Sequence, residues 1–490
     1  MEVLRLGAIG LFTCLVLLAT LPVFTGLYQF LLVAVSLFRT HLERAGQDLP
    51  RVSILIPAWN EDAVVAVTIE RLMSLDYPLD RLRIYVIDDG SSDETPHIVI
   101  EKAKCYPDNV IHIRRVAGGE GKAHTLNYGL DTLWKSEWTQ AVLIMDADVI
   151  YTRDSLRQMA RHLVDPEIGA VTAYIKEGSA DPNLIQRFIT FEYITATGAS
   201  RRAQNVLGFL ACLSGGAQLH SRENLMDIGG KIFDDTLAED TFTTFRTQLK
   251  GRKAIFEPNA IVYAEEPCDL DMLWKQRLRW ARGNVQITQV FRRLWFNKRA
   301  HPTLGSPSMA ALWFSIFLMP VFQITATTGL LVLYLIDKEL SWTLFQLFWI
   351  SAALVYMQVT LTSFVVDAES AVKSWAEGFL FPGLVSLSVI VFSLVPGLAD
   401  ALSAALGLRS ESWVSICSVL LLYSWNSLSM LVAWSAKEVE KAGWQRTSSV
   451  LLLVAGYGPF LCAVTFASYI KEWQGAARTW DKTVKTGKVS

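Results

Sequence analysis

Ala141-Val-Leu-Ile-Met-Asp-Ala-Asp148 is the stretch that decides the fold class of this chain. Five apolar residues lead directly into two aspartates, Asp146 and Asp148. A short apolar run of this kind is typical of a strand buried on both faces of a sheet. In open α/β sheets, ligands bind beyond the carboxyl ends of the strands. The segment therefore predicts a central strand with a polar site at its end.

Two further segments extend this prediction. Val52–Pro57 and Arg83–Asp88 are short apolar runs, and both are followed by turn-forming residues. Glu61–Leu75 has helical spacing, and Ser92 and Asp93 are suited to cap a helix after the second run. Strands that alternate with helices predict an α/β domain with a mainly parallel sheet.

Acidic residues recur at the predicted strand ends, as Asp88, Asp89, Asp146 and Asp148. A single aspartate there is usually a turn former or a helix cap. Two aspartates at positions i and i+2 of an extended chain point to the same side. Their hard oxygen donors suit Mg²⁺ or Mn²⁺, with a diphosphate filling the remaining positions.

Three glycine-rich or acidic segments are further site candidates. Gly118–Lys122 is rich in glycine and ends in a cation that can face a phosphate, although a flexible turn is the simpler interpretation. Gly215 and Gly216 precede a segment with helix-like spacing. Glu239 and Asp240 supply either a helix cap or a catalytic base.

The composition indicates a membrane protein. Of 490 residues, 51% are hydrophobic and only 19% are charged, and the mean hydropathy is +0.30. The excess lies in blocks, and the first, Leu6–Phe38, contains no charged residue and is expected to bend near Pro22. Five more blocks are each long enough to span a bilayer: 307–336, 342–366, 375–397, 412–435 and 448–470.

The distribution of charge predicts the topology. Arginines follow the first block, and they favour a cytoplasmic position for the α/β domain. The tail 471–490 is also basic, so it too is expected to be cytoplasmic. Five C-terminal crossings would place the tail outside, so the 375–397 block is predicted to be re-entrant or interfacial. Residues 275–300 contain eight Lys or Arg and no acid, which is typical of an amphipathic segment at the membrane surface. Five domains are predicted. They are an N-terminal membrane helix (1–45), the α/β domain (46–265), an amphipathic interfacial segment (266–306), the C-terminal membrane helices (307–470) and a basic cytoplasmic tail (471–490).

Other classes of protein are disfavoured. A formal net charge of −2 argues against a nucleic-acid partner. The six cysteines are widely spaced and form no CxxC pair, so neither a disulfide framework nor a zinc site is expected.

Five motifs, in this order, resemble the family 2 inverting glycosyltransferases of the GT-A fold. They begin with Val52–Glu61 and Asp88–Ser91, and they continue with Asp146–Asp148, Glu239–Asp240 and Gln276-Arg-Leu-Arg279-Trp280. The chain is most similar to the membrane-embedded processive synthases of poly-N-acetylglucosamine, chitin oligosaccharide, hyaluronan and cellulose. It has Ala238-Glu-Asp where several relatives have Thr-Glu-Asp.

The resemblance implies roles for individual residues. The nucleotide and the donor sugar would be held by Pro57, Ala58, Asn60, Glu61, Asp88, Asp89, Lys122, Asp146, Asp148, Gln276 and Arg279. Asp146 and Asp148 would also bind Mg²⁺ or Mn²⁺, and Asp240, beside Glu239, would be the general base. Trp280, Gly215 and Gly216 would meet the acceptor. A gating tail would contain Trp480, Lys482, Thr483 and Lys485.

The implied activity is processive transfer from a nucleotide sugar, expected to be a UDP-sugar, to a β-linked polysaccharide that crosses the bilayer. The catalytic domain would be cytoplasmic and the protein multi-pass, with accessory export proteins as candidate partners. Two alternatives stay open: a non-processive transferase that acts on a lipid acceptor, and a transporter whose soluble domain only senses nucleotide.

Overall fold

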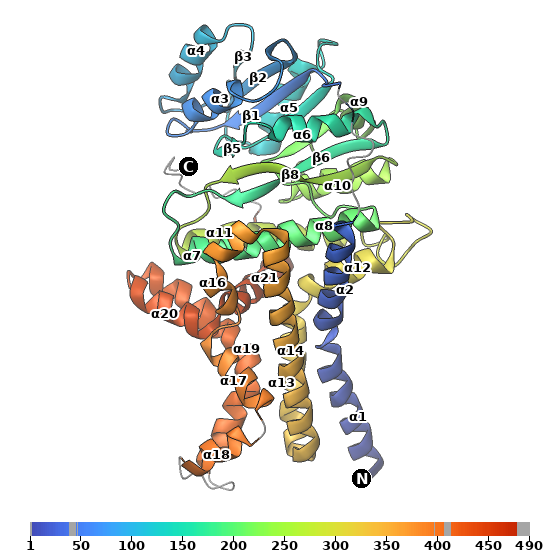
Figure 1. The fold of residues 1–490 in the computed structure, drawn as a ribbon, viewed down its shortest axis with the longest axis vertical. Coiled ribbons are helices and arrows are strands. Elements are labelled where there is room, and N and C mark those ends of the chain that lie inside the picture. Colours follow the sequence, from blue (N-terminus) through green and yellow to red (C-terminus); the bar gives the residue numbers. More distant parts are fainter. Residues whose placement is uncertain (1, 39–45, 47, 396, 406–412, 478–490) are drawn as a thin grey trace. The chain divides into compact units, whose positions relative to one another are not determined.

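The computed structural model describes residues 2–38, 46, 48–395, 397–405 and 413–477 (Figure 1). Its chain divides into two compact units. The sheet unit contains 32–268, 283–310 and the residues from 477, and the helix unit contains the chain up to Leu31, Asp269–Arg282 and Ala311–Ala476.

The sheet unit is built on one eight-stranded sheet with the order β3-β2-β1-β4-β7-β6-β8-β5. Strand pairing makes β7 and β5 antiparallel to their neighbours, while the other strands run in one direction. The predicted mainly parallel α/β sheet is therefore confirmed. The strands are β1 (Val52–Ala58), β2 (Leu82–Asp88), β3 (Val110–Arg114), β4 (Ala141–Ile144), β5 (Val149–Tyr151), β6 (Ile168–Glu177), β7 (Gln218–Ser221) and β8 (Lys253–Ala264).

Alternation along β1 creates two apolar layers. Ile54 and Ile56 belong to a core with Ile69 of α3 (Val65–Met73), whereas Leu55 belongs to the opposite core with Leu126. Successive side chains of a strand point to opposite faces, so an uninterrupted apolar run buries both. The other helices of this unit are α4 (Thr95–Cys105), α5 (Lys122–Leu133), α6 (Ser155–Ala160), α7 (Leu184–Glu192), α8 (Ser200–Leu207), α9 (Arg222–Asp227) and α10 (Glu239–Leu249).

The helix predicted from Glu61 begins later, at Val65. Asn60 has the left-handed backbone conformation, with φ of 54°, which ends the extended strand and starts a loop instead of a helix. The amide of Glu61 donates to Thr95 Oγ1 at 2.8 Å, so a long-range contact holds this loop open. Periodicity alone does not reveal such a contact.

Two other local predictions are corrected. The segment after Gly216 is the strand β7, and the helix α9 follows only at Arg222. Ser92 does not cap α4, because its amide donates to Asn60 Oδ1 at 2.8 Å. Asp93 does act at this helix start, since its Oδ1 accepts from the amide of Thr95 at 3.0 Å.

A π-helix, Tyr193–Ala199, joins α7 directly to α8. The N-terminus of α7 is fixed by a capping box, in which Asn183 and Gln186 exchange hydrogen bonds. The C-terminus of α8 is closed by Gly208, whose φ is 75°. The three segments thus form one continuous helical rod with both ends defined by sequence.

Most of the apolar blocks lie in the helix unit, whereas 32–38 and 307–310 belong to the sheet unit. Among the described residues, four helical runs are long and apolar enough to cross a membrane: Glu2–Ser36, Met319–Ile336, Lys338–Val366 and Ile416–Lys441. The first run is interrupted between α1 (Glu2–Leu18) and α2 (Leu21–Ser36), immediately before Pro22. Proline lacks an amide hydrogen and is tolerated only in the first turn of a helix, where Pro22 lies.

The remaining blocks are divided more finely than their lengths predict. The helices are α11 (Leu270–Val290), α12 (Pro307–Phe317), α13 (Met319–Ile336), α14 (Lys338–Val366), α15 (Ala368–Lys373), α16 (Trp375–Phe379), α17 (Leu384–Leu394), α18 (Leu398–Ala405), α19 (Trp413–Lys441), α20 (Gln445–Ala455) and α21 (Tyr457–Trp473). The 375–397 block contains α17, which has 11 residues, fewer than the ~20 that a crossing needs. The 448–470 block is bent by 95° between α20 and α21, and it makes a fifth span if the pair is counted as one.

The bend between α20 and α21 interlocks with the turn before α17 through two glycines. Gly456 has φ and ψ of 101° and 152°, and Gly383 has 88° and 154°. A Cβ on Gly456 would lie 2.4 Å from the carbonyl carbon of Pro382, and one on Gly383 would lie 2.4 Å from that of Ala455. The backbone next to each glycine thus occupies the space where the other glycine would carry a side chain.

We expect Gly456→Ala to destabilise the helix unit by at least about 1–3 kcal/mol, because this backbone region is almost restricted to glycine. The melting temperature of the purified full chain in detergent measures the effect. Gly10→Ala is the matched control, since nothing lies within 4 Å of the added methyl group on α1. Equal melting temperatures for both variants would contradict the interlock.

Candidate active site

Lys122 is the first residue of α5 and lies among carboxylates at the carboxyl ends of the strands. Its Nζ lies 2.5 Å from Asp146 Oδ1 and 3.8 Å from Glu239 Oε1, and its side chain is 8% exposed. Burial lowers the pKa of Lys122, but the carboxylates of Asp146 and Glu239 outweigh that effect and raise it above its ordinary value. The ammonium group therefore stays charged.

The glycine segment Ser214–Gly216 closes one side of this cluster. Lys122 donates to the carbonyl of Gly215 at 3.1 Å, and Tyr151 donates to that of Gly216 at 3.2 Å. A Cβ on Gly215 would lie 3.3 Å from both Asp240 Oδ2 and Lys122 Nζ. A Cβ on Gly216 would lie 3.3 Å from Asp146 Oδ2. The two missing side chains keep the space between the carboxylates open.

Asp240 and Glu239 lie in the first turn of α10, where the helix dipole favours negative charge. The position before them, Ala238, is the N-cap and makes no side-chain cap. A Cβ on Gly283 would lie 2.6 Å from the Cβ of Ala238. The absence of a side chain at Gly283 therefore allows this close approach to Ala238. Neither carboxylate is itself the N-cap residue, so the simple capping interpretation does not account for the pair.

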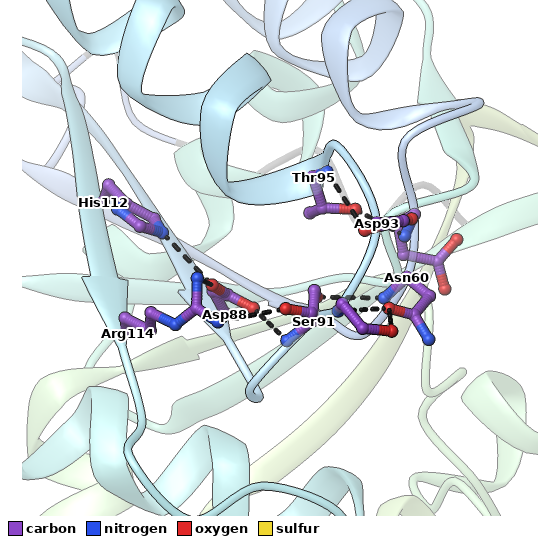
Figure 2. A network of polar contacts seen from close by, with 9 residues as sticks. Asn60, Asp88, Ser91, Asp93, Thr95, His112 and Arg114 are labelled. Atoms are coloured by element: carbon purple, nitrogen blue, oxygen red, sulfur yellow. Dashed lines mark hydrogen bonds and ion pairs between the residues drawn. The ribbon is translucent and has the colours of Figure 1, made fainter.

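The β1 and β2 loops are tied together at one edge of the site (Figure 2). The amide of Asn60 donates to Ser91 Oγ at 3.0 Å, and that of Asp62 donates to Asp93 Oδ2 at 3.2 Å. Pro57 and Ala58, at the end of β1, pair in register with Ile87 and Asp88 of β2. The predicted nucleotide loop is thus held by its neighbour before any ligand binds.

Asp88 lies at the centre of the network in Figure 2 and is fully buried. Its Oδ1 accepts from the amide of Ser91 at 2.8 Å. Its Oδ2 lies 3.4 Å from Arg114 and 3.5 Å from His112 Nε2. Arg114 also donates to the carbonyl of Ser91 at 3.0 Å. In this structure, Asp88 organises the loop around the site.

Asp89 connects this loop to the glycine-rich turn. It forms an ion pair with the buried Arg115, which also pairs with Glu120. Asp89 Oδ2 accepts from the amide of Gly119 at 3.0 Å. A Cβ on Gly118 would lie 1.8 Å from the carbonyl oxygen of Asp89, so only glycine fits there. The turn that ends in Lys122 is therefore fixed in place.

Sequence reasoning missed two residues that contact the glycine segment, Tyr151 and Arg201. Burial raises the pKa of the Tyr151 hydroxyl well above its usual range, so it remains a hydrogen-bond donor. Arg201 Nη1 donates to Ser214 Oγ at 2.6 Å. Arg115 was missed too, although its position directly after β3 marks it as a strand-end residue.

The Gln276–Trp280 motif lies on α11, in the part that belongs to the helix unit. Gln276, Arg279 and Trp280 are spaced i, i+3 and i+4, so they share one face of the helix. The buried Arg277 lies with its guanidinium carbon 4.2 Å from the Trp280 ring centroid. Their roles toward the donor and acceptor stay predictions. The proposed gating residues Trp480, Lys482, Thr483 and Lys485 lie outside the described residues.

The carboxylate oxygens of Asp146 and Asp148 fit a divalent metal ion only if a bound ligand supplies further oxygens. Asp146 and Asp148 flank the buried Ala147, and the Asp146 side chain is 40% exposed. Within the described part of the chain, no group of three or more His, Cys, Asp or Glu is arranged to hold a metal. Mg²⁺ is typically held by one or two carboxylates, with water and phosphate oxygens completing its coordination. The two aspartates match that pattern.

Comparison with known proteins bears on the family and the fold of this domain. Residues 50–283 match the family model described as glycosyltransferase like family 2. A probable glycosyltransferase of Bacillus subtilis, YdaM, is 29% identical over 325 residues, which cover 66% of this chain and 76% of that protein. A poly-beta-1,6-N-acetyl-D-glucosamine synthase of Staphylococcus epidermidis is 29% identical over 251 residues, 51% of this chain and 58% of the synthase.

Among solved structures, the chain is similar to the mannosyltransferase PcManGT from Pyrobaculum calidifontis, solved in complex with GDP-Man and Mn²⁺. The TM-score is 0.55 at 23% sequence identity, and the match covers 74% of this chain and 99% of that one. This likeness concerns the fold, and it agrees with the predicted GT-A sheet. Residues 50–283 match a family 2 glycosyltransferase domain, and this match together with the named relatives identifies the chain as a glycosyltransferase.

Proposed function

We propose that this chain polymerises a sugar from a nucleotide-diphosphate donor, expected to be a UDP-sugar, into a β-linked polysaccharide at a membrane. The observation that carries the proposal is the cluster of Lys122, Asp146 and Asp240 around Gly215 and Gly216. It unites a buried cation, one of the two carboxylates proposed to bind a metal, and a candidate base at the carboxyl ends of the strands. Named relatives that are polysaccharide synthases support the polymer as product.

Under this proposal each group has a task. Asp240 accepts the proton of an acceptor hydroxyl, whose oxygen attacks the anomeric carbon as the bond to the diphosphate breaks. Lys122 faces the charge that develops on the leaving diphosphate. When bound at Asp146 and Asp148, a divalent ion would neutralise part of the same charge. A single displacement inverts an α-linked donor and gives a β-linkage.

The helix unit supports the membrane part of the proposal. In the described part of the chain, four or five runs have the length and composition of membrane spans. A hydrophilic polymer made on one side of a bilayer needs a protein-lined path across it, because hydrocarbon does not solvate its hydroxyl groups. We infer a cytoplasmic sheet unit, a multi-pass helix unit and export coupled to synthesis. The predicted gating tail would act at that step.

Asp240→Asn removes the base with almost no change of shape. We expect a loss of about 10²–10⁴-fold in nucleoside diphosphate release, because general base catalysis contributes that much. The affinity for the donor, measured by isothermal titration calorimetry, should equal that of the wild-type chain. Asp234→Asn is the matched control, since that carboxylate is 52% exposed and pairs with His124. Unchanged substrate flux in Asp240→Asn would favour the transporter alternative and contradict this proposal.

Lys122→Met removes the cation from the carboxylate cluster. We expect kcat/KM to fall about 10²–10³-fold, the effect of losing one group that stabilises transition-state charge. Steady-state release of nucleoside diphosphate with Mg²⁺ or Mn²⁺ measures it, and the exposed Lys135→Met serves as control. A variant that keeps wild-type kcat/KM would show that Lys122 does not face the leaving group.

Product length separates processive from single transfer. The purified full chain in lipid nanodiscs is given each nucleotide sugar in turn, with metal and a large excess of primer. We expect long products early, while most primer is still unused. One sugar per acceptor would support the non-processive alternative, and no diphosphate release with any donor would refute the proposal as a whole.

A further inference from the structure

Arg201, at the start of α8, contacts the glycine segment one residue before the carbonyl that Lys122 holds. We propose that Arg201 is a positioning residue for sugar transfer: through Ser214 it fixes the segment Cys212–Gly216 against Asp240 and Lys122. This inference rests on the proposed function, because it assigns Asp240 and Lys122 to the reaction.

The first support is the contact itself. Arg201 Nη1 donates to Ser214 Oγ at 2.6 Å, and its guanidinium carbon lies 5.9 Å from the ring centroid of the buried Phe256. A guanidinium is planar and is therefore well oriented when it contacts both an aromatic ring and a hydrogen-bond acceptor. The hydroxyl of Ser214 is thus fixed one residue before Gly215.

The second support is the way in which the rest of the segment is held. The amide of Leu213 donates to Thr244 Oγ1 at 2.8 Å, and Thr244 in turn donates to the carbonyl of Asp240 at 2.6 Å. The amide of Ser214 donates to Thr172 Oγ1 at 3.0 Å. Gly215 and Gly216 have no side chains to pack, so hydrogen bonds determine where their carbonyls lie. Arg201 provides such a bond from α8.

The third support is charge. Burial lowers the pKa of Arg201, whereas the Cys212 thiol and the Asp240 carboxylate act in the opposite direction. An arginine remains protonated in proteins, so a positive charge accompanies the hydrogen bond to Ser214. Attraction between charges is strong where water is excluded, and it favours a fixed position of the Asp240 carboxylate. The Cys212 thiol belongs to the same segment and donates to the carbonyl of Leu213 at 3.0 Å.

The test compares Arg201→Gln with Arg201→Lys and Arg202→Gln. Arg202 is the matched control, because it lies on the same helix and 5.7 Å from the same Phe256 ring, yet it donates to Gly198 in its own helical rod. We expect Arg201→Gln to lower kcat about 100-fold, the effect of a small misplacement, with the donor KM unchanged. Lysine should restore most of kcat. Equal losses in both glutamine variants would overturn the proposal.

Ser214→Ala tests the route without removing the buried charge. If Arg201 acts through Ser214, the double variant Arg201→Gln/Ser214→Ala should be no slower than Arg201→Gln alone. Losses of kcat that multiply would show that the two residues act independently, and they would refute the proposed route. Ser214→Ala alone removes the acceptor of Arg201 and should lower kcat with the donor KM unchanged, so it keeps the test decisive if Arg201→Gln does not fold, and an unchanged kcat in Ser214→Ala would overturn the proposal.

Labelling of Cys212 by a maleimide, located by peptide mass mapping, gives a readout that does not need activity. Burial raises the pKa of the Cys212 thiol far above its ordinary value, and the charge of Arg201 opposes this increase, so the loss of Arg201 alone would slow labelling. Faster labelling in Arg201→Gln, but not in Arg202→Gln, therefore reports a loosened segment. Unchanged or slower labelling would contradict the positioning role. If the wild-type chain turned over no donor, the proposed function would fail, while the labelling would still judge Arg201.

Discussion

The ammonium group of Lys122 is the interaction on which the site depends. Asp146 follows β4 and Glu239 begins α10, and they lie 2.5 and 3.8 Å from the Lys122 ammonium group, so the two negative charges would repel each other without it. Lys122 offsets that repulsion and also holds the carbonyl of Gly215. The glycine-rich turn before Lys122 is itself held in place by Asp89 and Arg115. The order of the strands brings the carboxylates together, and Lys122 makes their closeness tolerable.

The sheet and its acidic edge were predictable from the sequence, and the contacts between segments were not. Continuous apolar runs, such as Val52–Pro57, mark strands buried on both faces, and the parallel order follows from their alternation with helices. Asp146 and Asp148 were found because they directly follow such a run. A sequence pattern carries no information on which side chain from another element will meet them.

The misses have physical causes of the same kind. The helix start at Val65 depends on Asn60 and Thr95, which are far apart in the chain. Tyr151 and Arg201 lack any motif, because each acts on a backbone or hydroxyl group that tertiary folding brings near. The 448–470 block reads as one span, yet Gly456 bends it by 95°, and the reason is a close approach to Pro382. The predicted site roles, including those of Gln276, Arg279 and Trp280, stay predictions.

The π-helix Tyr193–Ala199 has a consequence for how this protein can change over evolutionary time. A π-turn holds one more residue than an α-turn, and residues of an α-helix are offset by about 100° each. Deleting one residue there would restore a regular helix, and α8 would keep nearly the same direction, because the wide turn already accommodates the extra residue. A deletion in the regular turns of α7 has no such turn to absorb it, and it would rotate the following side chains by about 100°. The π-turn is therefore the place in this rod where the loss of one codon leaves Arg201 facing Ser214.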